Sequence, residues 1–313
     1  MTSNSTNRGR RALWPVVLFM LGAGSASAAD YAYDAPSGDW RANPINWVDT
    51  EGGYFDYPSE FDDASIGTTF PANLFGLTSN VTLTTVESAR SVFLGRGANA
   101  FGSITLQPGS ALITNDLYLG TQLTSSTGAV HRNGGSLNVG SVSLVNGSVL
   151  NLLPGDVIGQ LNFYTGSPTA SLVQPAGAST GLTLTRSAPN ALTFATAGGR
   201  LRLTFDGVAS SGLDWVLRVA NPSGGDWVAT LNGLIGSGNV VVSGSGFSVF
   251  SSPDGFTYVA VPEPATMPPV VALAVAALAR RRRRRRIDCG VARGRTRRPD
   301  RSTSSVLPRA PVP

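Results

Sequence analysis

An internal repeat of short strands and tight turns constrains this chain more than any other feature of its sequence. Segment 102–112 aligns with segment 140–150 at an offset of 38 residues, following the pattern G-S-[IV]-[ST]-L-x-[PN]-G-S-x-L. Apolar and hydroxyl side chains alternate within each copy, which is typical of a strand with one buried face. A Pro-Gly pair at 108–109 and an Asn-Gly pair at 146–147 are turn dipeptides at equivalent positions. The repeat predicts an all-β body.

A second set of repeats has offsets of 25 and 20 residues and consists of Leu94-Gly95, Leu119-Gly120 and Val139-Gly140. Such spacings, with 38 residues as about two coils, favour a β-solenoid over 76–158, in which the strands of successive coils stack. The pattern resembles the parallel β-helix of autotransporter-like surface proteins. Antiparallel hairpins in a sandwich would also contain short strands and Gly turns, so that arrangement stays open as the alternative.

The segment 30–75 precedes these repeats, is rich in aromatic side chains and carries nine acidic residues between positions 30 and 63. An open solenoid end exposes apolar core and unpaired strand edges, so we expect this segment to form a cap. Its GDWRANPINW element resembles segments that open repeats in other surface proteins of this kind. A calcium site at Asp56, Asp62 and Asp63 is the functional alternative, because carboxylates suit that ion. Regular ligand spacing is missing, so we expect no metal and no other cofactor.

The segment 159–261 contains strand-like runs between Gly, Pro, Asn and Asp turns, which predicts an antiparallel β-sandwich-like module. The runs are GLTLT, RLRLTF, DWVLRVA, WVATL, NVVVSG and FTYVAV. We expect Trp215 and Trp227 to fill the core or a sheet edge of this module, with carbohydrate stacking as their functional alternative.

Positive charge is concentrated in the two tails of the chain. The whole chain has a formal charge of +5, but residues 30–261 contain 8 Arg against 16 Asp and Glu, a net charge of −8. An acidic body repels phosphate, so we expect no nucleic-acid partner.

Residues 1–29 have the order of a secretory signal peptide. Arginines at 8, 10 and 11 precede an apolar stretch at 12–24 and small residues at 25–29. Signal peptidase would cut after Ala28 or Ala29, since Ala26 and Ala28 fit its A-x-A preference. A permanent membrane helix is the alternative, but about 13 apolar residues are few against the roughly 20 that span a bilayer. The single cysteine, Cys289, lies outside the body, so we expect no disulfide there.

Three ordered features occupy residues 262–286. A Pro262-Glu263-Pro264 motif precedes an apolar stretch at 267–279. The stretch is followed by the seven arginines Arg280, Arg281, Arg282, Arg283, Arg284, Arg285 and Arg286. This order closely resembles the PEP-CTERM sorting signal of exported Gram-negative proteins.

The resemblance implies that an exosortase-type enzyme recognises the motif, cuts near it and passes the body to the cell surface. The apolar stretch would form a short C-terminal transmembrane helix, and the arginines would stop its transfer through the inner membrane, giving a transient anchor. Residues 287–313 are rich in Arg, Pro and Ser and are expected to be a disordered tail.

No catalytic residues are expected. The sequence GASTG at 177–181 matches a nucleophile elbow, but the partner His of such a site follows the Ser in the chain. The only histidine, His131, precedes Ser179 and is expected at a turn or on the surface. One His and no Cys in the body exclude structural zinc and Cys-His catalysis. A glycosidase or lyase that uses carboxylates alone stays open.

These features together predict an exported cell-surface or extracellular-matrix protein with a structural or adhesive role. The expected partners are signal peptidase, an exosortase-type processing enzyme, the membrane and an extracellular polysaccharide. The alternative is a secreted carbohydrate-binding or carbohydrate-active protein of the glycosidase or lyase type.

Overall fold

The computed structural model describes residues 28–51, 55–69, 78–122, 125–175, 178–187, 190–206, 214–244 and 246–261. The described residues form an all-β fold with one α-helix and one short 3-10 helix, η1 (Pro44–Asn46). The predicted signal peptide up to residue 27, the sorting signal at 262–286 and the tail at 287–313 lie outside the described residues. Within the described ranges, no helix is both long enough and apolar enough to span a bilayer.

The strands form two sheets. The larger sheet contains, in spatial order, β19 (Ser248–Ser251), β20 (Phe256–Val261), β17 (Asp214–Ala220), β14 (Leu182–Leu184), β12 (Val157–Phe163), β10 (Ser136–Leu144), β8 (Ala111–Leu119), β6 (Val86–Arg96), β4 (Asp63–Thr68), β1 (Asp30–Tyr33) and β3 (Trp47–Asp49), with β15 (Leu192–Phe194) also paired to β12. The smaller sheet contains β18 (Val240–Ser243), β16 (Arg200–Asp206), β13 (Thr169–Pro175), β11 (Val149–Leu152), β9 (Thr127–Arg132), β7 (Phe101–Leu106), β5 (Thr78–Leu83) and β2 (Ser37–Asp39).

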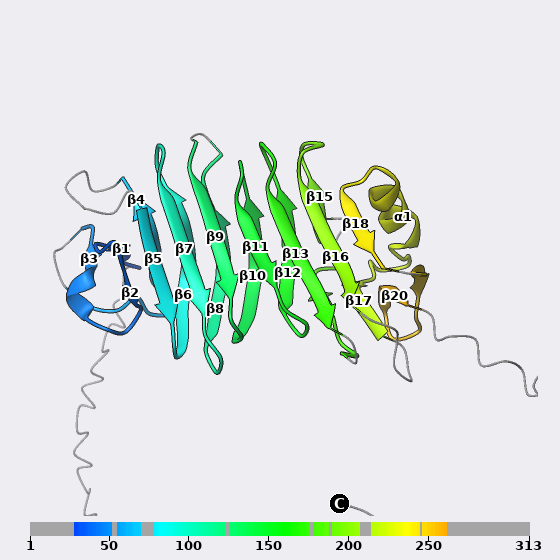
Figure 1. Cartoon of the computed structure of the whole chain (residues 1–313), viewed down its shortest axis with the longest axis horizontal. Coiled ribbons are helices and arrows are strands. Elements are labelled where there is room, and N and C mark those ends of the chain that lie inside the picture. Colours follow the sequence, from blue (N-terminus) through cyan, green and yellow to red (C-terminus); the bar gives the residue numbers. More distant parts are fainter. Residues whose placement is uncertain are drawn as a thin grey trace, which may run out of the picture.

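The chain alternates between the two sheets, so consecutive strands from β4 to β13 lie in the larger and the smaller sheet by turns (Figure 1). Strands of successive passes pair in parallel: Leu94 lies opposite Leu119, and Leu119 opposite Leu144. The predicted 25-residue repeat from Leu94 to Leu119 is therefore confirmed. The 20-residue step to Val139 is wrong, because Val139 pairs with Thr114 and the true third member is Leu144.

The 38-residue repeat does not mark two complete passes. Ile104 lies on β7 in the smaller sheet, whereas its counterpart Val142 lies on β10 in the larger sheet, three strands later. The two copies look alike because the strands of both sheets alternate inward and outward side chains and end at a turn. The turns themselves are confirmed: Gly109 and Asn146 have positive φ angles of 83° and 52°.

The predicted antiparallel sandwich at 159–261 is wrong for most of its length. Strands β12 to β14 and β16 to β18 pair in parallel with their neighbours and continue the two sheets. Among the described strands, antiparallel pairing is confined to β1 with β3 at one end and to β17, β20 and β19 at the other. Short alternating strands between tight turns are compatible with either kind of pairing, so the pattern did not discriminate.

The run WVATL, predicted as a strand, begins a helix. Helix α1 (Val228–Gly236) starts directly after Trp227. Trp227 and Leu231 are buried in the main core, and Leu234 and Ile235 pack against it. These four apolar residues recur at the three- and four-residue spacing of a helix face, which explains why the segment is helical.

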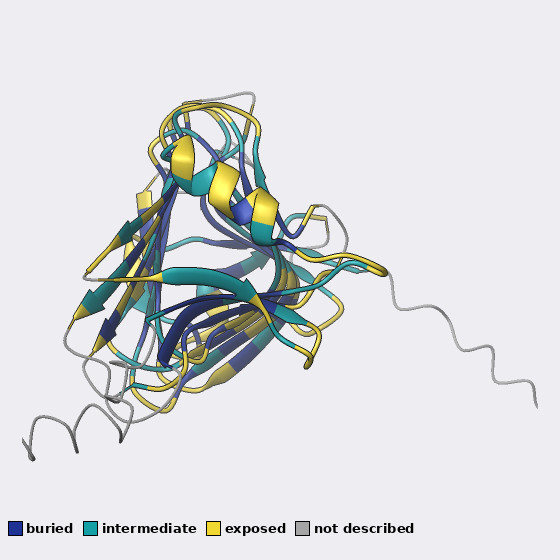
Figure 2. Cartoon of the chain, turned by 90° about the vertical axis from the view of Figure 1, so that its right-hand side faces the viewer, coloured by how far each residue is buried: buried dark blue, intermediate teal, exposed yellow. Residues whose placement is uncertain are grey.

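Buried and exposed residues alternate along many of the strands that enclose the interior (Figure 2). Most of the buried apolar residues belong to one continuous core cluster between the sheets. At the N-terminal end, Trp40, Trp47 and Tyr33 are fully buried, with ring centroids 4.6 Å apart for Trp40 and Trp47 and 5.0 Å apart for Tyr33 and Trp47. The indole Nε1 of Trp47 donates to the carbonyl oxygen of Trp40 at 3.0 Å. Aromatic residues of the 30–75 segment thus cover this end of the core.

Four neighbouring strands of the larger sheet share a bend. The ladder pairing skips one residue on each of β6, β8, β10 and β12, namely Arg90, Asn115, Gly140 and Gly159. Backbones approach closely in this row: a Cβ atom on Gly140 would lie 2.7 Å from the carbonyl oxygen of Asn115. Side chains are therefore excluded from the bend at β10 and β12, but present at β6 and β8.

A buried ion pair joins β9 to the turn before β12. The Arg132 guanidinium donates to both carboxylate oxygens of Asp156 at 2.9 Å, and the two side chains are only 1% and 2% exposed. Asp156 also accepts from the backbone N–H groups of Leu137 and Leu153. Each charge is thus surrounded by hydrogen bonds, as burial requires.

Candidate functional site

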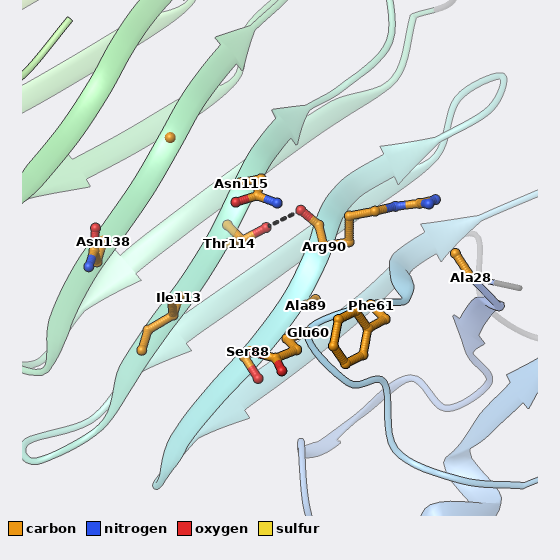
Figure 3. A pocket seen from close by; sticks show the side chains of 11 residues that line it. Ala28, Glu60, Phe61, Ser88, Ala89, Arg90, Ile113, Thr114, Asn115 and Asn138 are labelled. Atoms are coloured by element: carbon orange, nitrogen blue, oxygen red, sulfur yellow. Dashed lines mark hydrogen bonds between the residues drawn. The ribbon is translucent and has the colours of Figure 1, made fainter. Parts of the chain in front are cut away.

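A surface pocket of about 740 Å³ lies at the bend of β6, β8 and β10, and we call it the bend pocket. Its lining comes from these three strands, from the loop before β4 and from Ala28 (Figure 3). Stacking of strands about 4.8 Å apart places equivalent residues of the three strands side by side. The parallel register therefore builds the site.

One row of lining residues points outward from the strands. Ser88, Ile113 and Asn138 lie directly opposite one another on β6, β8 and β10. Ile113 is 44% exposed although it is apolar. The second row is the bend itself, where Asn115 and Gly140 line the pocket. The floor thus offers hydroxyl and amide groups around one apolar side chain.

The loop at 59–62 forms a wall of the pocket with Glu60 and Phe61. Asp62 holds this loop in place, because it accepts hydrogen bonds from the backbone N–H and the hydroxyl of Ser59. Asp62 also accepts from the Ala29 backbone nitrogen at 2.9 Å. Phe61 is 64% exposed, so its ring is presented to solvent at the pocket edge.

Arg90 lines the pocket but its charge is already paired. Its Nε and Nη2 atoms donate to the two carboxylate oxygens of Asp63 at 2.9 and 2.7 Å. These hydrogen bonds, together with the charge of Asp63, raise the pKa of Arg90. Figure 3 shows the guanidinium directed away from Ile113 and Asn138. The carbonyl oxygen of Arg90 accepts from the Thr114 hydroxyl at 3.0 Å, which joins β6 to β8 beside the pocket.

A ladder of aromatic and polar groups continues on the other side of the bend. The rings of Phe93 and Tyr118 stack with centroids 4.7 Å apart and an angle of 6° between planes. The Arg96 guanidinium lies 4.8 Å from the centre of the Phe93 ring. Burial and the charge of Asp63 raise the pKa of Asp116. Within the described part of the chain, the Asp116 carboxylate has no hydrogen-bond or ion-pair partner.

The residues predicted from sequence to be functional are not gathered at this pocket. Ala28 and Ala29 are described and lie beside it, whereas Ala26, Pro262, Glu263, Pro264 and the seven arginines Arg280 to Arg286 lie outside the described residues. Asp56, Asp62 and Asp63 form no calcium site: within the described ranges, no group of three His, Cys, Asp or Glu side chains could hold a metal ion. Asp62 and Asp63 instead accept the hydrogen bonds given above.

The tryptophans and His131 fall where the sequence predicts them, and Ser179 lies outside any site of the nucleophile-elbow type. Trp215 and Trp227 are buried, which confirms their assignment to packing rather than to a sugar-binding surface. His131 is exposed, on strand β9 and not in a turn. Ser179 is exposed in an irregular segment with no helix after it, unlike the serine of a nucleophile elbow.

Sequence reasoning did not find the bend pocket. Its outward row consists of common residue types at 25-residue intervals, namely Ser88, Ile113 and Asn138. Outward positions on repeats that share one sheet could have identified the row, but only with the correct 25-residue register. The assignment of the third repeat to Val139 obscured that register.

No protein-family model matches the chain, and no curated protein or solved structure shows a significant similarity to it. The chemistry of the site must therefore be judged from its own groups. The hydroxyl and amide groups, the Glu60 carboxylate and the exposed Phe61 ring suit the binding of a polar, uncharged ligand by hydrogen bonds and ring contact.

Proposed function

We propose that this chain is an exported cell-surface or extracellular-matrix protein that acts as a structural or adhesive component rather than as an enzyme. In this proposal its body is a β-solenoid, and it reaches the surface through signal peptidase and a PEP-CTERM-type sorting signal. The observation that carries the structural part is the in-register parallel stacking of strands around one continuous core. Such stacking gives an elongated and regular body with long outer faces, as in other repeat proteins.

The sorting part of the proposal rests on the order of motif, apolar stretch and arginines at 262–286. Proline on each side of Glu263 favours an extended backbone, because each ring fixes φ and restricts the residue before it. An extended motif between body and membrane segment is accessible to a processing enzyme. Arg280 to Arg286 would hold the chain at the inner membrane until cleavage.

Expression in a host with an exosortase tests this proposal. Glu263→Ala should leave a full-length, membrane-retained species, while replacement of the seven arginines by Ser should release an unprocessed chain into the periplasm. Glu51→Ala, which changes an exposed carboxylate outside the bend pocket, serves as the control and should mature normally. If both C-terminal variants reach the surface with wild-type size, the sorting proposal is refuted.

A secreted carbohydrate-binding protein is the second candidate, and the bend pocket is the observation that favours it. The pocket combines an exposed ring with several hydrogen-bonding side chains. This function is compatible with adhesion, since surface proteins attach to matrix through glycans. Measurement of reducing ends released from polysaccharides would separate binding from hydrolysis.

A further inference from the structure

We propose that the bend pocket binds a neutral polysaccharide, with the sugar chain running across β6, β8 and β10. This inference rests on the proposed adhesive function and specifies its ligand. It starts from the composition of the pocket: Ser88, Asn115 and Asn138 supply hydroxyl and amide groups, and Phe61 supplies an exposed ring. Amide groups both donate and accept, as recognition of sugar hydroxyls requires. The ring can contact the apolar face of a pyranose, which combines carbon packing with polar edges.

The charge around the pocket selects an uncharged sugar. Arg90 is the one cation among the described lining residues, and its charge is paired with Asp63, to which two of its three guanidinium nitrogens donate. Glu60 and, across the bend, Asp116 have no ion-pair partner within the described residues. The electrostatic potential at the pocket is therefore negative, and it disfavours the binding of uronic acids, sulfated sugars and phosphate-bearing ligands.

The lining also argues against a peptide ligand. At the pocket, β8 pairs with a strand on each side, whereas residues 86–90 of β6 pair only with β8, and the Arg90 N–H donates to the carbonyl oxygen of Asp62 in the neighbouring loop. The unpaired edge is therefore short, and a bound peptide strand draws its affinity from a row of backbone hydrogen bonds. Among the described lining residues only Phe61 and Ile113 are large and apolar, which is little for a hydrophobic peptide anchor.

The geometry of the lining favours a polymer over a single sugar. Residues from three successive strands contribute, and each strand lies about 4.8 Å from the next. A hexose unit in a chain has a similar length, so successive sugars meet successive strands. Ser88, Ile113 and Asn138 then face adjacent units of one glycan.

Calorimetric titration of the full-length chain with a soluble neutral glucan and with polygalacturonate tests this inference. We expect binding of the glucan and none of the polygalacturonate. Phe61→Ala should weaken glucan binding about tenfold through loss of the ring contact. Phe55→Ala is the matched control, because Phe55 is also exposed, at 53%, but does not line the pocket.

A second pair of variants tests the location of the binding site by introducing a bulky side chain inside or outside the bend pocket. Ser88→Trp should abolish binding by filling the pocket, while His131→Trp, at an exposed position on the smaller sheet, should leave binding unchanged. Circular dichroism confirms that each variant is folded. Equal binding of polygalacturonate, absence of glucan binding, or equal effects of Phe61→Ala and Phe55→Ala would each overturn the inference. Surface labelling of intact cells tests the proposed function separately. A chain that reaches the surface but binds no glucan would refute only the assignment of the ligand.

Discussion

Removal of the Asp156 carboxylate should destabilise the body more than any other single charge deletion. In Asp156→Ala, the Arg132 guanidinium keeps its place between β9 and the following turn but loses its counter-charge. An uncompensated buried charge costs about 3 to 5 kcal/mol of unfolding free energy. The N–H groups of Leu137 and Leu153 lose their acceptor as well, which moves the expected cost toward the upper end of that range.

Thermal unfolding followed by circular dichroism measures this effect. For a body of this size, each kcal/mol lowers the melting temperature by about 2 to 4 °C, so Asp156→Ala should lower it by roughly 10 °C or more. Glu51→Ala is the matched control, because Glu51 is exposed and its carboxylate has no partner within the described residues, so its removal should change the unfolding free energy by less than about 0.5 kcal/mol.

The double variant Arg132→Met/Asp156→Leu tests whether the unpaired charge of Arg132 causes the loss of stability. It removes both charges and should recover part of the loss, since paired apolar replacements are far less costly than one orphaned charge. If Asp156→Ala melts within the range of the Glu51→Ala control, the pair contributes no stability and the argument from burial is wrong.

Three further predictions follow from other contacts. The pKa of Asp116 is raised by burial and by Asp63, so the folded chain loses stability as the pH rises from the ordinary Asp pKa of about 3.9 through the folded value. Asp116→Asn should therefore unfold at a higher denaturant concentration than wild type at about pH 7, and at the same concentration at about pH 3. Gly140→Ala should cost about 1 to 3 kcal/mol, since its Cβ would meet the Asn115 carbonyl oxygen, whereas Gly147→Ala, with no atom within 4 Å, should cost far less in the same urea titration. Cleavage after Ala28 would place a new ammonium group, at Ala29, 2.9 Å from the Asp62 carboxylate. This amino group is charged at about pH 6 and neutral at about pH 10, so Asp62→Asn should lower the melting temperature of exported protein more at the lower pH. N-terminal sequencing that finds Met1 retained would contradict this prediction.

Local features of the fold could be predicted because they depend on neighbouring residues. The turns at Gly109 and Asn146 follow from dipeptides that favour positive φ, and the Leu94 to Leu119 repeat follows from side chains that occupy the same place in successive passes. The sheet to which a strand belongs could not be predicted in this way. Ile104 and Val142 have nearly identical surroundings in sequence, yet lie in different sheets.

Long-range features of the site escaped prediction for the same reason. Arg132 and Asp156 are 24 positions apart and neither has a distinctive local pattern, so nothing in the sequence pairs them. The bend pocket depends on the register of three strands and on a loop fixed by Asp62. Helix α1 was missed because Trp227, Leu231, Leu234 and Ile235 were judged by β-propensity instead of by spacing.

The alternation of the chain between two sheets also determines how the body would respond to mechanical tension. Each pass is hydrogen-bonded to the next along the long axis of the stack, so a pull applied between the two ends would load one rung at a time. The hydrogen bonds of a rung would then break in sequence from an end, as in a zipper, and not all together as in shear. A released pass of 25 residues would lengthen the chain by roughly 85 Å at about 3.4 Å per residue. A protein built in this way would unfold in small repeated steps, dissipating force while the remaining passes stay folded.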